Sequence, residues 1–169
     1  MAERKLRELA ERHYDRIFRA ARFLCGDLQA AEDLAQETFL AAAKSLAGFE
    51  GRSSPYTWLY GILLNKFRRW MRRKRGATVS LHGMAEDDEH LEEHEALHAD
   101  YPDPGQAAER KETIELVRQA VASLSADHRS VITMRYVEGM SYQEIAQVLD
   151  CPVGTVKSRI HYALRGIAR

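Results

Sequence analysis

The chain has 169 residues, of which 45% are hydrophobic and 30% are charged. That length permits one medium-sized domain or two small ones, and the hydrophobic share is enough to build a core. No apolar run approaches a membrane span and no signal-peptide pattern opens the chain, so we expect a cytoplasmic protein without membrane insertion. The two cysteines, Cys25 and Cys151, lack metal-ligand neighbours and are expected to be reduced, buried thiols.

Three helices are predicted in the first part of the chain. The first spans about residues 6–24 and the second about 28–46, with Gly26-Asp27 as a stop and a new cap between them. A third helix follows over about residues 55–74. Apolar positions recur at helical spacing in all three, which predicts an all-α domain over residues 1–75.

One flank of the third predicted helix carries an aromatic ring, an amide and several guanidinium groups. At 100° per residue these side chains share a strip. Such a strip can stack an unpaired base, hydrogen-bond its edge and neutralise phosphates, which is the chemistry of single-stranded nucleic-acid binding. For Trp58 the alternative is an ordinary core position. The strip consists of Trp58, Asn65, Arg68, Arg69 and Arg72.

The composition of residues 76–103 indicates a flexible acidic linker. A run of basic residues ends at Arg75, whereas residues 86–103 contain acids and neither Lys nor Arg. The equal totals of 25 basic and 25 acidic residues therefore conceal a strong segregation of charge. The segment has no sustained apolar period, so it is not expected to build a core.

The same segment contains His94-Glu95-Ala96-Leu97-His98, which has the H-E-x-x-H spacing of zinc metalloproteases, with His90 one turn earlier. A metal is conceivable there, but the surrounding residues are polar on every side and offer no apolar face to bury a site. We therefore interpret the segment as a solvated linker and expect no metal, cofactor or catalytic residues.

Two further helices are predicted after the linker, over about residues 104–123 and 125–139, the second capped by Ser125. Their apolar positions, among them Ile114, Val117 and Tyr136, are expected to pack against the end of the chain. Together with that end they predict a second all-α domain over residues 104–169.

The last two predicted helices form a helix-turn-helix. Ser141 and Glu144 have the spacing of a capping box, and residues 150–152 interrupt the apolar pattern before the final helix. The inward stripe of that helix is predicted to be Val156, Ile160, Ala163, Leu164 and Ile167. Its outer face then carries hydroxyl and basic groups suited to phosphates and base edges, which favours duplex DNA over a merely solvated face. That face holds Thr155, Lys157, Ser158, Arg159, His161, Tyr162 and Arg165.

Over nearly its whole length the chain resembles the extracytoplasmic-function (ECF) class of bacterial sigma factors. Residues 31–40, AEDLAQETFL, resemble the region 2 helix that docks on the clamp helices of the polymerase β′ subunit. Residues 57–65, with the basic run after them, resemble the part that melts and reads the −10 element. Residues 124–165 resemble region 4, and residues 151–159, CPVGTVKSR, match its −35-reading helix.

The resemblance implies two small helical domains on a flexible tether, which bind core RNA polymerase through the β′ clamp helices and the β flap. The chain would direct promoter-specific initiation without being an enzyme, under the control of an anti-sigma factor. By position, the implied polymerase contacts are Asp33, Gln36 and Glu37, the −10 contacts are Trp58, Asn65, Arg68, Arg69 and Arg72, and the −35 contacts are Thr155, Lys157, Ser158, Arg159 and Arg165.

Three positions depart from the family pattern. Asp150 replaces the usual Gly of the turn, although Asp tolerates left-handed geometry better than most residues. Ser125 stands where Pro is common, and Tyr162 stands where a basic residue is frequent. Because the chain stops at Arg169, close behind the motif, a further C-terminal extension is conceivable.

Two other functions fit parts of the sequence. An autonomous helix-turn-helix regulator would explain residues 104–169 but would leave the acidic face near Asp33 and the strip near Asn65 unused. A helical adaptor would use the acidic and basic faces to bind proteins rather than DNA.

Overall fold

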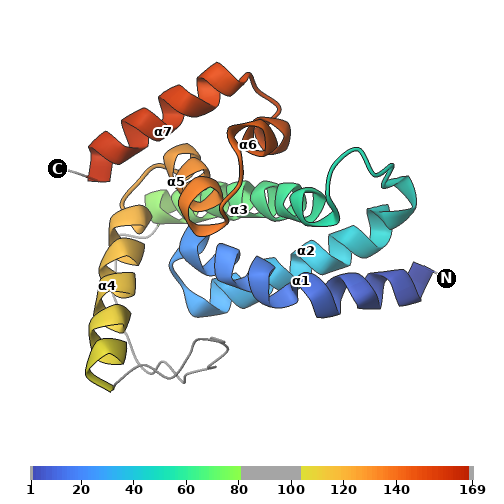
Figure 1. The fold of residues 1–169 in the computed structure, drawn as a ribbon, viewed down its shortest axis with the longest axis horizontal. Coiled ribbons are helices and arrows are strands. Elements are labelled where there is room, and N and C mark those ends of the chain that lie inside the picture. The colour runs from blue at the N-terminus through green and yellow to red at the C-terminus, as the bar shows by residue number, and fades with distance from the viewer. Residues whose placement is uncertain (1, 81–103, 168–169) are drawn as a thin grey trace.

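The computed structural model describes residues 2–80 and 104–167, with side chains placed in 4–74 and 113–167. Every regular element in these ranges is helical, which confirms the predicted all-α class (Figure 1). No helix in these ranges is long and apolar enough to cross a membrane. The histidines of the H-E-x-x-H segment lie outside the described residues.

The first part of the chain folds into a bundle of helices. It contains α1 (Ala2–Cys25), α2 (Leu28–Ser45), the 3-10 turn η1 (Leu46–Gly48) and α3 (Pro55–Ser80). α1 and α2 pack along each other, and α3 packs against both (Figure 1). The buried side chains at this junction include Ile17, Leu24, Leu34, Leu59, Leu63 and Phe67.

Local signals place the helix boundaries largely as predicted. Gly26 has a φ of 74°, and the side chain of Asp27 accepts a hydrogen bond from the first turn of α2 at 2.6 Å. Left-handed backbone favours glycine, so this stop and cap are explained by residue type alone. α3 begins at Pro55 as predicted but continues to Ser80, past the expected end near residue 74.

The second part contains α4 (Pro104–Ala122), α5 (Ala126–Ile132), the wide turn η2 (Thr133–Val137), α6 (Tyr142–Leu149) and α7 (Val153–Ile167). The capping-box prediction is confirmed, because Ser141 Oγ accepts from Glu144 N at 3.2 Å and Ser141 N donates to Glu144 Oε2 at 2.8 Å. These hydrogen bonds lower the pKa of Glu144. Ser125 likewise caps α5, as predicted.

The helix predicted over residues 125–139 is not a uniform α-helix. At η2 the backbone hydrogen bonds join residues five positions apart, as in a π-helix. Glu138 N, for example, donates to Thr133 O at 3.0 Å. A π-helical turn inserts residues relative to an α-helix and so rotates the side chains that follow. Tyr136, predicted to be buried, is 59% exposed as a result, and Glu138 is only 8% exposed.

Three further predicted packing positions are wrong. Ile114 and Val117 of α4 are 41% and 48% exposed, because α4 packs on α1 through its C-terminal end, where Val121 is buried. Leu164 is 42% exposed, because α7 packs on α5 along a narrower stripe than predicted. That stripe consists of Val156, Ile160 and Ala163, and Leu164 lies beside it.

The two halves of the chain share one core. They were predicted as two helical domains joined by a flexible linker, and in the described residues these domains pack on each other: α5 and α6 pack against α3, and η2 packs against α1 (Figure 1). Buried Phe67 and Leu24 from the first half join Val131, Ile132 and Met134 from the second in one apolar cluster. Burial of apolar surface therefore stabilises the contact between the halves as well as each half alone.

We predict that Ser141→Ala lowers the free energy of unfolding by about 1 kcal/mol, because it removes the hydroxyl that satisfies a backbone N–H at the start of α6. Urea denaturation followed by circular dichroism measures the change. Gln143→Ala, an exposed substitution in the same helix, is the control and is expected to change stability little. Equal midpoints for Ser141→Ala and the unmodified chain would contradict the cap's contribution.

The cysteines are predicted to differ in reactivity. Cys25 is buried and Cys151 is half-buried, and both are free thiols. Burial raises the pKa of Cys25 to about 11, so this thiol stays protonated and unreactive at pH 8. Timed iodoacetamide labelling with mass spectrometry is expected to modify Cys151 well before Cys25, and urea should remove the difference. Similar rates in the folded protein would refute this burial argument.

Candidate nucleic-acid and protein interfaces

The outer face of α7 collects the residues predicted to bind duplex DNA. Lys157, Ser158 and Arg165 are exposed, and Thr155 and Arg159 are half-exposed. Val156, Ile160 and Ala163 beneath them are buried, so packing fixes which side of α7 meets solvent. α7 contains no acidic residue, which leaves this face basic. It therefore has the composition of a surface that contacts phosphates and base edges.

The turn before α7 adopts the geometry that its sequence permits. Asp150 is the single non-glycine residue in the described part of the chain with a positive φ, at 50°. Cys151 N donates to Ala146 O at 3.1 Å across the turn. Asp in place of Gly is therefore compatible with a helix-turn-helix.

The predicted strip on α3 is exposed in part. Asn65, Arg69 and Arg72 are open to solvent. Trp58 is half-buried, with its ring centroid 4.8 Å from that of Phe49, so it combines a packing role with a partly open ring.

Arg68 does not join the other strip residues. It lies roughly 80° around α3 from Trp58 at 100° per residue, toward the second half of the chain. Its guanidinium is 3.8 Å from the carboxylate of Asp127 in α5. The structure therefore separates Arg68 from the strip that α3 presents to solvent.

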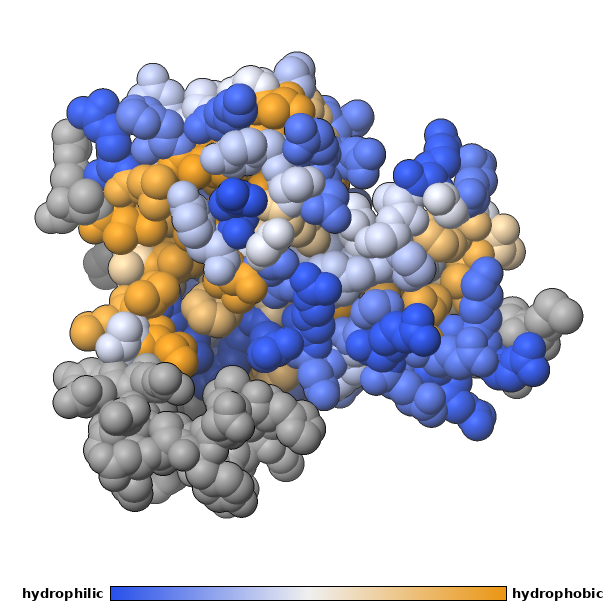
Figure 2. Space-filling view, in the orientation of Figure 1, coloured by the Kyte–Doolittle hydropathy of each residue, from blue (hydrophilic) through white to orange (hydrophobic). Residues whose placement is uncertain are grey.

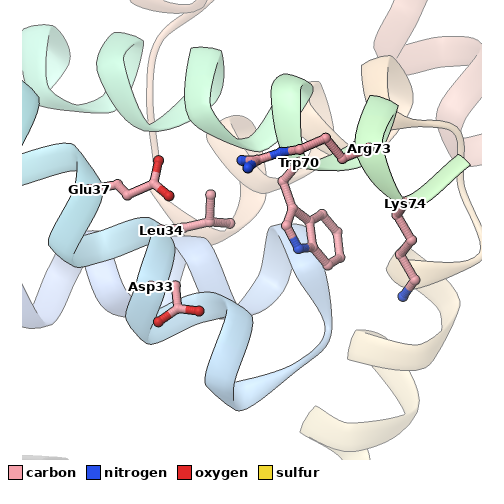
Figure 3. A pocket seen from close by; sticks show the side chains of 6 residues that line it. All are labelled: Asp33, Leu34, Glu37, Trp70, Arg73 and Lys74. Carbon is pink, nitrogen blue, oxygen red and sulfur yellow. The ribbon is translucent and has the colours of Figure 1, made fainter. Parts of the chain in front are cut away.

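The acidic face of α2 borders an open pocket of about 370 Å³ (Figure 3). Asp33 and Gln36 are exposed, whereas Glu37 forms an ion pair with Lys66 of α3 at 3.2 Å. Figure 3 shows the carboxylates on α2 and the indole of Trp70 on α3 at the same opening. The lining residues are Asp33, Leu34, Glu37, Trp70, Arg73 and Lys74.

Sequence reasoning missed the α3 side of this pocket. The apolar periodicity of α3 groups Trp70 with the core positions, but its side chain is half-buried, and the ammonium of Lys74 lies 5.0 Å from its ring centroid. The i, i+4 spacing of Lys66, Trp70 and Lys74 was the available signal, because it places them on one face of α3. Only the packing of α2 on α3 identifies that face as a neighbour of Glu37.

Comparison with protein families matches both halves of the chain. Residues 9–77 match the model described as Sigma-70 region 2, and residues 114–165 match Sigma-70, region 4. The RNA polymerase sigma-H factor of Pseudomonas aeruginosa is 40% identical over 141 residues, which cover 83% of this chain and 72% of that protein. The ECF RNA polymerase sigma-E factor of Escherichia coli K12 is 37% identical over 135 residues, covering 80% and 70%. The chain belongs to the ECF sigma factors. It is an alternative sigma factor that directs promoter-specific transcription, and an autonomous regulator is not favoured.

Two solved structures have the same fold. The sigma factor RpoE of Bartonella quintana, in complex with the anti-sigma factor NepR, aligns with a TM-score of 0.74 and 25% identity over 96% of this chain and 94% of that one. CnrH, in complex with the cytosolic domain of CnrY, aligns with a TM-score of 0.66 and 26% identity over 98% and 86%.

A buried carboxylate joins region 2 to region 4 of this ECF sigma factor. Glu138 follows η2 in region 4, and its side chain is 3% exposed. Its Oε2 accepts from Arg16 Nε at 2.9 Å and from the hydroxyl of Tyr56, both in region 2. Arg16 Nη2 also donates to Glu138 O at 2.9 Å, and its guanidinium stacks 3.7 Å from the Tyr56 ring centroid. Burial and the nearby Glu138 raise the pKa of Tyr56 and of Tyr60, so both phenols stay neutral.

A second polar contact across the same boundary involves Arg129 of α5. Its guanidinium donates to Leu24 O, at the end of α1, at 2.7 Å and to Leu124 O at 3.0 Å. Burial lowers the pKa of this arginine. Neither this contact nor the one at Glu138 was predicted, because each joins residues that are far apart in sequence.

An exposed hydrophobic patch lies on α4 and α7. Figure 2 shows it as orange surface along the side of the molecule where α4 meets the C-terminal end of α7. The exposed large hydrophobic side chains on these two helices include Ile114, Leu116, Val117 and Leu164. Contiguous apolar patches on a protein surface commonly mark sites of association with other proteins.

Proposed function

We propose that this ECF sigma factor binds core RNA polymerase through region 2, captures the −10 element with α3 and holds the −35 element with α7. The observation that carries the proposal is the outer face of α7. Basic and hydroxyl side chains cover this face, no acidic residue interrupts it, and the opposite side of the helix is the buried apolar stripe. The sigma factor supplies recognition, and the polymerase supplies the chemistry of RNA synthesis. Because the polymerase works there, we place the chain in the cytoplasm.

The −35 contacts divide by chemistry. Thr155 and Ser158 lie in the first turns of α7, where hydroxyls and backbone N–H groups suit phosphate oxygens. Lys157 supplies a point charge for phosphates, whereas the guanidinium of Arg159 can bind the paired acceptors on a guanine edge. Arg165, further along the helix, extends the basic face toward the backbone of the duplex. Together these residues can position the duplex and read its sequence.

The −10 contacts follow from α3. Asn65 can hydrogen-bond a base edge, and the exposed guanidinium groups of Arg69 and Arg72 can neutralise the strand's phosphates. Trp58 offers a half-open ring on which a base can stack. In the described structure Arg68 pairs with Asp127, and parting of regions 2 and 4 frees its guanidinium for the strand.

The polymerase contacts centre on α2. Asp33 and Gln36 are exposed beside a pocket with Trp70 in its wall, which offers a negative charge and an aromatic anchor at one place. Aromatic side chains in pockets often dominate the energy of protein association. We therefore extend the predicted face of Asp33, Gln36 and Glu37 to include Trp70.

We also propose an anti-sigma factor as a partner. The aligned RpoE structure holds one, and this chain exposes large hydrophobic side chains on α4 and α7. An amphipathic segment of such a partner could cover them.

Asp33→Ala is predicted to weaken binding to core polymerase roughly fivefold, about 1 kcal/mol, because it removes an exposed charge from the docking face without breaking an ion pair among the described residues. Purified chain and core polymerase are titrated by fluorescence anisotropy, then tested for run-off transcription from a cognate promoter. Glu11→Ala removes an exposed acid from α1 and serves as the control. Failure of the unmodified chain to bind polymerase or direct initiation would overturn the proposed function, and unchanged affinity for Asp33→Ala would overturn this face alone.

Arg159→Ala is predicted to weaken holoenzyme binding to its −35 element by about 1–3 kcal/mol and to relax preference at one base pair, since a guanidinium bound to a base edge is lost. Competition with promoters substituted singly across the element measures both effects. Lys157→Ala is the comparison and should weaken all sequences alike. The same uniform loss for Arg159→Ala would limit that residue to phosphate contact.

A further inference from the structure

The described structure brings the two promoter-reading modules closer together than promoter DNA permits. Elements centred near −35 and −10 lie about 25 base pairs apart, or roughly 85 Å of duplex at ~3.4 Å per base pair. Yet α6, the first helix of the helix-turn-helix, packs directly on α3. Given the proposed function, regions 2 and 4 must separate before α3 and α7 can occupy their elements together.

The connection between the regions can extend over nearly that distance. Residues 81–103 join α3 to α4, and a chain of this length reaches roughly 80 Å when fully extended. Covalent connectivity therefore does not hold the regions together, so noncovalent contacts determine whether they stay packed.

Among these contacts the cluster at Glu138 is the most specific. A carboxylate that loses water is strongly disfavoured unless cationic and hydrogen-bonding partners replace the water. All the side-chain partners of Glu138 in the described residues, Arg16 and Tyr56, belong to region 2. The turn η2 directs Glu138 toward them, so the carboxylate is satisfied in the closed arrangement and becomes hydrated when the regions part.

The closed arrangement also contains unsatisfied groups that oppose it. The hydroxyl of Tyr60 and Nε of Arg129 are buried near the boundary without a hydrogen-bond partner among the described residues. Such groups regain partners in water, which favours opening. The balance between closed and open forms is therefore held by few interactions and is sensitive to the loss of one.

We propose that Arg16, Tyr56 and Glu138 form an interdomain latch that holds the free sigma factor closed and must open when it joins core polymerase. This inference rests on the proposed function. Only the open form can reach both promoter elements. The apparent affinity for polymerase is therefore the affinity of the open form multiplied by the fraction of molecules that are open. Removing a region 2 partner raises the free energy of the closed form alone, because the buried Glu138 then keeps only one of its two side-chain partners.

Small-angle X-ray scattering of the isolated full chain tests the latch without polymerase. A compact chain of this length has a radius of gyration of about 15 Å, and separated domains give a larger value. We expect the unmodified chain to lie near the compact value and Arg16→Ala to expand. Tyr56→Phe removes only one hydroxyl and should expand less. Arg19→Ala is the control, because Arg19 is exposed on the same helix.

Titration with core polymerase supplies the second readout. Arg16→Ala is expected to bind roughly tenfold more tightly than the unmodified chain, Tyr56→Phe to bind with intermediate affinity, and Arg19→Ala to bind unchanged. Circular dichroism establishes that each variant keeps its helices, and Tyr56→Phe provides the test if Arg16→Ala fails to fold.

Three results would overturn the latch. They are an unmodified chain that is already extended, a folded Arg16→Ala or Tyr56→Phe variant that stays compact, and an expanded variant whose polymerase affinity does not rise. By contrast, an unmodified chain that is compact but never binds polymerase would overturn the proposed function. In that case scattering would still report on the closed contact.

Discussion

A buried carboxylate is the most specific contact that sets how regions 2 and 4 of this ECF sigma factor sit against each other, beside the hydrogen bond from Arg129 to Leu24 O. Glu138 carries its charge into a space closed to water, which would be strongly unfavourable without Arg16 and Tyr56. Apolar packing between the regions is tolerant of small shifts, whereas these hydrogen bonds require a defined position. The carboxylate thus selects one arrangement from many that would bury similar apolar area.

The closed arrangement leaves most of the proposed contact residues open to solvent. Asp33 on α2, Asn65 and Arg69 on α3, and Lys157 on α7 are all exposed. Closure therefore does not work mainly by covering these surfaces. It sets the distance between them, and Arg68, paired with Asp127, is the exception in which closure also occupies a contact residue.

The sequence predicted the local features of this fold because their causes are local. Asp27, Ser125 and the pair Ser141 and Glu144 cap helices through residues three positions away, and Asp150 takes its left-handed conformation within one turn. The buried stripe of α7 follows from helical periodicity, which in turn leaves Thr155 to Arg165 outside. The helix-turn-helix face was therefore accessible to sequence reasoning almost completely.

The contacts between the regions were not accessible in the same way. Arg16 and Glu138 are 122 positions apart, and no periodicity connects them. The π-helical turn that aims Glu138 also lacks a residue signature, since the sequence from Thr133 to Val137 suits an ordinary helix equally well. Ile114, Val117 and Leu164 were misplaced for a related reason, because an apolar pattern does not reveal which neighbour will cover it.

On the proposed function, closure explains how a chain with two basic faces proposed to read DNA avoids acting without polymerase. A closed molecule engages one promoter element at a time, so it lacks the high effective concentration that a second linked contact would provide. Breaking the contacts of Glu138 costs free energy. Polymerase contacts on region 2 and promoter contacts at both elements can offset that cost only when all of them form. The requirement for polymerase then follows from the distance between the two faces and from the binding energy needed to separate them. No single surface has to be hidden for promoter engagement to fail.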